Sequence, residues 1–168
     1  MLHIFRIENG VLREKDTESI LPTLADDASW IDLVDSEDSE RELVQQFLEA
    51  ELPASDDMEE IEASARFFSD EQGLHVHSLF LFQSEGRART STVAFVVQEG
   101  RLLSFRDSRL PDFRLLRLRV RRGWVKTQQP IDILLSILEQ KVENLAVAIE
   151  DVHRDLEKVG YSVLEEEN

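Results

Sequence analysis

Four acidic side chains stand close together before position 61, and they are the residues in this chain best suited to hold a cation. Asp56, Asp57, Glu59 and Glu60 lie within five positions of one another. Like charges held this close repel, and a divalent cation relieves the repulsion. Hard cations such as Mg²⁺ and Ca²⁺ take oxygen ligands, so the cluster suits them better than softer metals. Acidic runs are also commonly solvated surface, so this signal alone is weak.

Two further pairs have spacings that metals use. His75 and His77 stand two apart on a predicted strand, so both point to one face of a sheet and could begin a transition-metal site. Glu150 and His153 share one face of a predicted helix, with the Glu-x-x-His spacing of di-iron bundles. The sequence offers no third ligand for the first pair and no second copy of the other. We therefore interpret the histidines as sheet residues and the second pair as a solvated helix flank.

The motifs of common enzyme classes are absent. There is no cysteine, which excludes disulfides, thiolate zinc sites and cysteine nucleophiles. No glycine-rich phosphate loop, Gly-x-Ser-x-Gly or His-Glu-x-x-His occurs. We predict that the protein is not an enzyme, and that a chain of this size needs no metal or cofactor in order to fold.

The charge of the chain excludes another class of partner. Its 168 residues carry 19 basic and 35 acidic side chains, a formal net charge of −16, and this field repels nucleic acid. Residues 101–130 nevertheless carry nine bases and two acids, so we expect acidic segments to neutralise them within the fold or between subunits. No stretch approaches the ~18 apolar residues of a membrane helix, and no signal peptide is apparent. We expect the chain as given to be soluble and cytoplasmic.

Short strands and helices must position these groups. Asn9-Gly10 between two apolar runs predicts a β-hairpin. Ser36 is a candidate N-cap for a helix that Pro53 ends. Pro111 opens a helix in which Arg114, Arg117 and Arg121 lie together on one flank of an apolar face. The strand at 74–82 is apolar on both faces, so we expect it to be central. We predict strands at 2–7, 11–13, 30–34, 65–68, 74–82, 92–98 and 102–106, and a short acidic helix at 56–61. This pattern predicts an α/β domain over residues 1–129, an αβα sandwich with a mixed sheet.

Residues 130–168 predict one long helix that projects from this body. Apolar residues recur there at alternating spacings of four and three, which is a heptad seam. They are Leu138, Val142, Leu145, Ile149, Val152, Leu156, Val159 and Val163. No other segment has a matching long stripe, so we expect the seam to pair with another chain or with sequence that this chain lacks.

Several segments together resemble the CorA family of divalent-cation channels, in particular the cytoplasmic N-terminal region of its proteobacterial members. Each segment alone is ordinary, but their order and spacing are specific and run through essentially the whole chain. The segments are Trp30–Asp35, Glu59–Phe68, Gly73–Ser78, Ser91–Phe95, Gly100–Leu102, Arg109–Arg114 and Asp155–Lys158.

The resemblance implies a homopentameric channel of the inner membrane that carries Mg²⁺, and also Co²⁺ and Ni²⁺. In this family an αβα sandwich on the cytoplasmic side precedes long funnel and stalk helices. Two C-terminal membrane helices and a Gly-Met-Asn motif follow, and neither is present in this sequence. We therefore expect the chain to stop early in the funnel helix that begins at residue 130.

The resemblance also implies a regulatory metal site. Family members are gated by cytoplasmic Mg²⁺ that acids bind between neighbouring subunits, and Glu59, Glu60 and Glu139 match three of these acids. Relatives often have aspartate at these positions. A further acid lies on the stalk beyond residue 168, so the site in this chain is incomplete and its metal binding is expected to be weak.

Two alternatives stay open. The zinc-transporting branch of the same superfamily shares this architecture, and the pore residues that set selectivity are absent from this sequence. A free-standing soluble domain could also oligomerise through its heptad helix and transport nothing. Under the leading interpretation, the chain alone does not form a stable pentamer, because most of the assembly surface is missing.

Overall fold

Seven strands form one mixed sheet at the centre of the molecule. The computed structural model describes residues 1–16, 27–48 and 67–166. The strands are β1 (Leu2–Glu8), β2 (Val11–Lys15), β3 (Trp30–Val34), β4 (Phe67–Asp70), β5 (Gly73–Ser84), β6 (Arg87–Gln98) and β7 (Arg101–Arg106). Their order is β2-β1-β3-β7-β6-β5-β4, in which β3 and β7 are parallel and the other neighbours antiparallel. The predicted mixed sheet is confirmed.

Two-residue turns set the register of two hairpins. Asn9 and Gly10 have φ angles of 51° and 74°, which confirms the predicted turn between β1 and β2. Glu85 and Gly86 make a similar turn, with φ angles of 52° and 72°, between β5 and β6. This second turn pairs Ser84 with Arg87, so β6 begins five residues earlier than its apolar pattern predicted.

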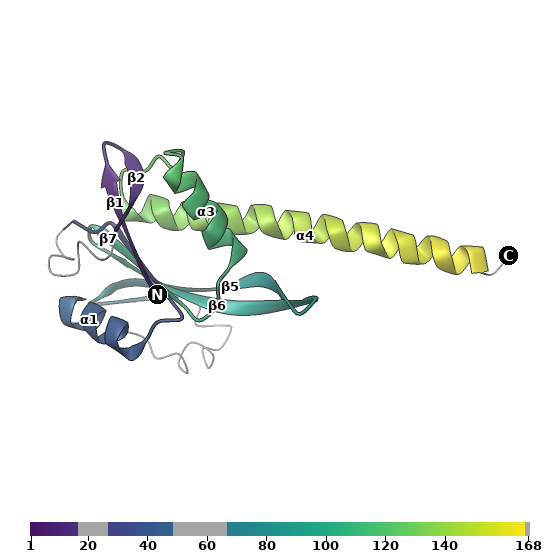
Figure 1. Cartoon of the computed structure of the whole chain (residues 1–168), viewed down its shortest axis with the longest axis horizontal. Helices are drawn as coiled ribbons and strands as arrows, with labels where there is room; N and C mark the ends of the chain where they lie inside the picture. The colour runs from purple at the N-terminus through teal and green to yellow at the C-terminus, as the bar shows by residue number, and fades with distance from the viewer. Residues whose placement is uncertain (17–26, 49–66, 167–168) are drawn as a thin grey trace.

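Helices cover both faces of the sheet. Figure 1 shows α1 (Asp38–Leu48) on one side and α3 (Pro111–Arg121) and α4 (Pro130–Glu166) on the other. On the side of α3 and α4, a core that includes Trp30, Phe80 and Phe113 is buried. The core on the side of α1 includes Val44 and Phe105. The αβα sandwich predicted from the sequence is therefore confirmed.

Two local predictions need correction. Helix α1 begins at Asp38, so Glu37 rather than Ser36 precedes it, and the Glu37 N–H donates to Glu40 Oε2 at 3.1 Å. An acid in the first turn supplies the cap because its carboxylate reaches back to this N–H. Strand β5 is paired on both sides only from Leu74 to Val76, because β4 is short. Its later residues form the sheet edge, where Leu79 is 44% exposed. The predicted end of α1 at Pro53 and the acidic helix at 56–61 lie outside the described residues.

Helix α4 confirms the predicted long helix. Its 37 residues span ~55 Å at about 1.5 Å per residue. Ile133, Leu134 and Ile137 are buried against the sheet and α3, whereas every described side chain from Ile149 to Leu164 is exposed. In Figure 1 the helix extends far beyond the sheet.

Candidate functional site

Of the three acids predicted to sense a metal, the structure describes Glu139. It is exposed in the third turn of α4. Leu135, four residues before it, and Val142, three residues after it, are 52% and 64% exposed. Residues at these spacings are neighbours on a helix surface, so Glu139 is a carboxylate beside exposed apolar side chains. Glu59 and Glu60 lie outside the described residues, as do Asp56 and Asp57.

Carboxylate oxygens are ligands that Mg²⁺ prefers, so the Glu139 side chain fits the regulatory ion that the family resemblance implies. Over residues 1–16, 27–48 and 67–166, no group of three or more His, Asp or Glu side chains is placed to hold a metal. Glu139 alone does not make a site. Ligands that complete one must come from the remaining residues or from a second subunit.

The contacts of His75, His77 and His153 agree with the interpretation from the sequence. His75 Nε2 lies 2.9 Å from Asp70 Oδ1, and the His75 ring stacks on Phe68 with centroids 4.4 Å apart. Burial lowers the pKa of His77, and the neighbouring His75 adds to this effect. His153 is exposed on α4, where it lies 3.5 Å from Glu157. These contacts are those of packed sheet residues and a solvated helix flank.

The distal part of α4 presents an unpartnered apolar stripe, which we call the α4 seam. Its side chains are 54–69% exposed, although large apolar side chains normally pack against something. The seam consists of Val142, Ile149, Val152, Leu156, Val159 and Val163. A heptad repeat of this length is typical of a helix that packs along another helix. No helix among the described residues is long and apolar enough to cross a membrane.

Polar contacts anchor the proximal part of α4 to the body. Asn144 Nδ2 donates to Asp112 Oδ1 of α3 at 2.9 Å, and Arg119 of α3 lies 3.1 Å from Glu143. Lys141 donates to Ser78 of β5 at 2.7 Å. Burial raises the pKa of Asp112. These bonds join the proximal part of α4 to α3 and to the sheet.

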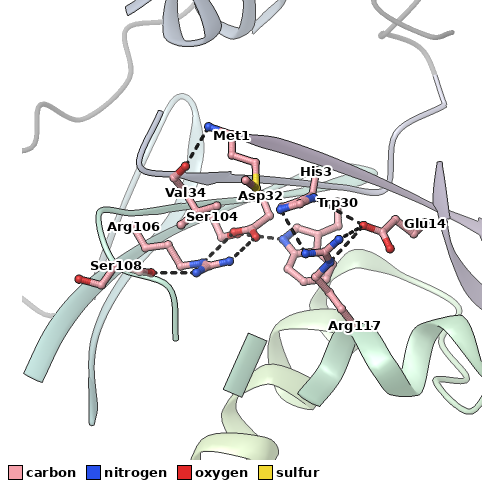
Figure 2. A network of polar contacts seen from close by, with 10 residues as sticks. All are labelled: Met1, His3, Glu14, Trp30, Asp32, Val34, Ser104, Arg106, Ser108 and Arg117. Atoms are coloured by element: carbon pink, nitrogen blue, oxygen red, sulfur yellow. Dashed lines mark hydrogen bonds and ion pairs between the residues drawn. The ribbon is translucent and has the colours of Figure 1, made fainter. Parts of the chain in front are cut away.

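A buried ion pair fixes the chain where it leaves the sheet for α3. Arg106 at the end of β7 donates from Nη2 to Asp32 Oδ2 at 2.8 Å and from Nε to Oδ1 at 3.3 Å. Ser104 donates to the same carboxylate at 2.7 Å, and the Trp30 indole donates to Ser104 at 3.0 Å (Figure 2). Arg106 Nη1 also donates to the Ser108 carbonyl at 2.8 Å. Sequence analysis missed this network, although an aspartate within the apolar run of β3 was its signal.

A second network joins β2 to α3 through Glu14. Arg121 donates to its carboxylate. Arg117 donates to the same carboxylate and also to His3 Nε2, the latter at 3.3 Å (Figure 2). Burial raises the pKa of Glu14, but hydrogen bonds from His3 and Arg117 outweigh this and lower it to about 2. Acids of the N-terminal segment thus neutralise arginines of the basic segment, as the charge distribution predicted.

This network predicts a measurable pH dependence of stability. The folded-state pKa of Glu14 is about 2 against 4.5 in the unfolded chain, so its contribution is present above pH 4.5 and is lost as the pH falls to 2. We expect Glu14→Gln to lower the free energy of unfolding by about 2 kcal/mol at pH 6, after discounting for solvent screening. The deficit should vanish near pH 2. Urea titrations at pH 6, 4 and 2.5 measure it, with the exposed Glu99→Gln as control. A deficit that stayed constant with pH would contradict the assignment.

The comparisons with known proteins agree with this geometry. The family model described as CorA-like Mg²⁺ transporter protein matches residues 25–168. "Magnesium transport protein CorA" of Escherichia coli K12 is 42% identical over 166 residues, which cover 98% of this chain and 52% of the relative. The protein of that name from Salmonella typhimurium LT2 shows the same identity and coverage. The chain therefore spans about half the length of these relatives.

Solved structures share the fold at low identity. The complete CorA magnesium transporter from Methanocaldococcus jannaschii has a TM-score of 0.74 and 14% identity, over 98% of this chain and 51% of that one. The ZntB cytoplasmic domain from Vibrio parahaemolyticus has a TM-score of 0.69 and 10% identity, over 93% and 63% of the two chains. Both structures thus show the same fold, whereas the family-model match and the 42% identity fix the family. This chain belongs to the family of CorA-like Mg²⁺ transporter proteins.

Proposed function

We propose that this chain is the cytoplasmic regulatory part of an inner-membrane Mg²⁺ channel that also carries Co²⁺ and Ni²⁺. The observation that carries the proposal is the 42% identity to magnesium transport proteins along 98% of the chain. The membrane-crossing part belongs, on this proposal, to the half of the relatives that this chain does not span. The role is conduction and its control, and no catalytic step is assigned to any residue.

The proposed division of labour follows the two parts of the chain. Residues 1–129 form the body that responds to the ion, and residues 130–168 begin the helix that carries the response toward the pore. The bonds from α4 to Asp112, Arg119 and Ser78 support this coupling, because they join the helix to the body without a flexible joint. In the complete protein, the α4 seam packs against helices of a homopentamer.

The sensor in this proposal consists of Glu59, Glu60 and Glu139 at the boundary between subunits. Glu139 supports it because this carboxylate lies beside Val142 of the α4 seam. When a second subunit covers the seam, the charge approaches an interface, where it is costly unless it is paired. Without metal, carboxylates that face one another push the subunits apart. Bound Mg²⁺ bridges them and shifts the population toward the closed assembly.

Transport is tested with the complete protein in liposomes that contain a Mg²⁺-sensitive dye. We expect Mg²⁺ influx down its gradient, and influx of Co²⁺ in a matched assay. Zn²⁺ influx without Mg²⁺ influx would support the zinc branch instead. No flux of any of these ions would contradict transport and favour a free-standing oligomerising domain. Liposomes without protein provide the baseline.

The exposed α4 seam predicts the behaviour of this chain alone. Specific and stable interfaces bury about 1,200–2,000 Å² in total, and the truncated seam offers only part of the pentamer's contact surface. We therefore expect the 168-residue chain to sediment below the mass of a pentamer at micromolar concentration. Sedimentation velocity over a range of concentrations measures this, with the complete protein in detergent as the comparison. A tight pentamer of the isolated chain would refute the prediction.

A further inference from the structure

A cavity of about 620 Å³ lies beside the start of α3, where the loop from β7 approaches β1, β3 and β5. This volume is within the range of ~300–1,000 Å³ that small-molecule sites occupy. Its described lining contains no aspartate or glutamate, in a chain that has 35 acids. Five basic side chains line it instead, which are His3, Arg106, Arg109, Arg114 and Arg117. The cavity is thus a positively charged hollow in a strongly acidic protein.

Two of these arginines are already neutralised, and two are available. Arg106 is paired with Asp32, and Arg117 with Glu14. Arg109 and Arg114 are exposed and have no ion-pair partner among the residues that the structure describes. Guanidinium groups match phosphate and carboxylate oxygens with two parallel hydrogen bonds. An anion in the cavity would therefore accept hydrogen bonds from the guanidinium groups of both Arg109 and Arg114.

The backbone that carries Arg109 and Arg114 is held in place before any ligand arrives. Arg106 Nη1 bonds the Ser108 carbonyl, which fixes the loop one residue before Arg109. The Arg114 N–H donates to the Leu110 carbonyl at 3.2 Å, which places Arg114 in the first turn of α3. Leu110 gives this helix no side-chain cap, and the acid in its first turn is the buried Asp112. The backbone at both arginines is therefore ordered before binding, and the ligand has only their side chains to order.

Apart from Gln83, the rest of the described lining is apolar. Val34, Phe82, Leu110 and Pro111 contribute to the cavity wall, together with Met1. A small inorganic anion would leave this surface unused, whereas a molecule with a flat ring would cover it and gain from its burial. Nucleoside phosphates combine both features at a size that fits the volume.

We propose that this cavity binds a small phosphate ester with a ring body, of the nucleoside phosphate class, through Arg109 and Arg114. The phosphates lie between the two guanidinium groups, and the ring lies on Phe82, Leu110 and Pro111. Neither the proposed metal sensor nor the α4 seam takes part, so this inference is independent of the proposed function.

Calorimetric titration of the 168-residue chain with ADP, in EDTA and low salt, tests the proposal. We expect saturable 1:1 binding. In Arg109→Gln/Arg114→Gln the affinity should fall about 30-fold or more, since each lost bond is charge-assisted. Arg109→Lys/Arg114→Lys keeps the positive charges but loses the paired donors of the guanidinium groups. Its affinity for ADP should therefore lie between that of the unmodified chain and that of the glutamine variant. Arg87→Gln/Arg89→Gln, at the tip of the β5–β6 hairpin, makes the same charge change outside the cavity and should bind like the unmodified chain.

The two parts of the ligand are separated by using pyrophosphate and adenosine as probes. Pyrophosphate should bind more weakly than ADP, and adenosine alone should not bind measurably. Thermal unfolding without ligand should be unchanged in all variants, because the substituted side chains are exposed. Absence of saturable ADP binding up to millimolar concentrations would overturn the proposal. An equal loss of ADP affinity in Arg109→Gln/Arg114→Gln and in the control Arg87→Gln/Arg89→Gln would overturn it as well. Pyrophosphate that bound as tightly as ADP would also overturn it.

Discussion

Replacing Asp32 with alanine is expected to lower the free energy of unfolding by about 3–5 kcal/mol, because it leaves a buried charge without its partner. Arg106 is only 5% exposed and bonds both oxygens of the Asp32 carboxylate. In the variant its guanidinium keeps the Ser108 carbonyl but loses the carboxylate to which it hydrogen-bonds, and Ser104 loses its acceptor. Domains of this kind are typically stable by about 5–15 kcal/mol, so the loss is a large fraction of the whole.

Urea unfolding of the 168-residue chain at neutral pH measures this effect. Asp27→Ala is the matched control, since the Asp27 side chain is 70% exposed and its contact with Arg6 is 3.5 Å long. This control should cost less than about 0.5 kcal/mol. Asp32→Leu/Arg106→Met removes both charges and should be much milder than Asp32→Ala alone. A loss from Asp32→Ala as small as that of the control would mean that Arg106 finds another partner or reaches water.

Much of the fold could be predicted from the sequence because its signals are local. Asn9-Gly10 requires positive φ angles and gives a hairpin wherever apolar runs flank it. The heptad spacing of α4 needs no knowledge of what surrounds the helix. The parallel pairing of β3 with β7 is different, since Trp30 pairs with Leu102 and no local pattern joins residues so distant in the chain. The Asp32–Arg106 pair depends on this pairing and was missed for the same reason.

The candidate sites divide in the same way. Glu139 was found from its position in a family motif, and its exposure beside Val142 follows from the period of α4. The proposed sensor takes its ligands from separate subunits, so one sequence offers candidate members but not their geometry. The cavity proposed to bind a nucleoside phosphate is lined by residues of β7, of the loop after it and of α3, together with side chains of β1, β3 and β5. Sequence analysis placed Arg114, Arg117 and Arg121 together on one helix flank. The structure gives them different partners, because Glu14 binds Arg117 and Arg121, whereas Arg114 lines the cavity without an ion-pair partner among the described residues.

The second prediction concerns how internal Mg²⁺ closes the proposed channel. Glu59→Gln, Glu60→Gln and Glu139→Gln, made together in the complete channel, keep the size of each side chain but remove its charge. Without these charges, Mg²⁺ has less to bridge, and its differential affinity for the closed state decreases. Couplings of this kind are typically 5–150-fold in affinity. We therefore expect closure to require at least about fivefold more internal Mg²⁺.

Mg²⁺ flux through the complete channel, measured against internal Mg²⁺ concentration, tests this claim most directly. Glu71→Gln, Glu99→Gln and Glu150→Gln together form the control, because they remove three charges at positions outside the proposed sensor. We predict that the inhibition curve of the sensor variant moves to higher internal Mg²⁺, while the control variant follows the unmodified channel. An inhibition curve of the sensor variant that coincides with that of the unmodified channel would contradict the assignment of Glu59, Glu60 and Glu139.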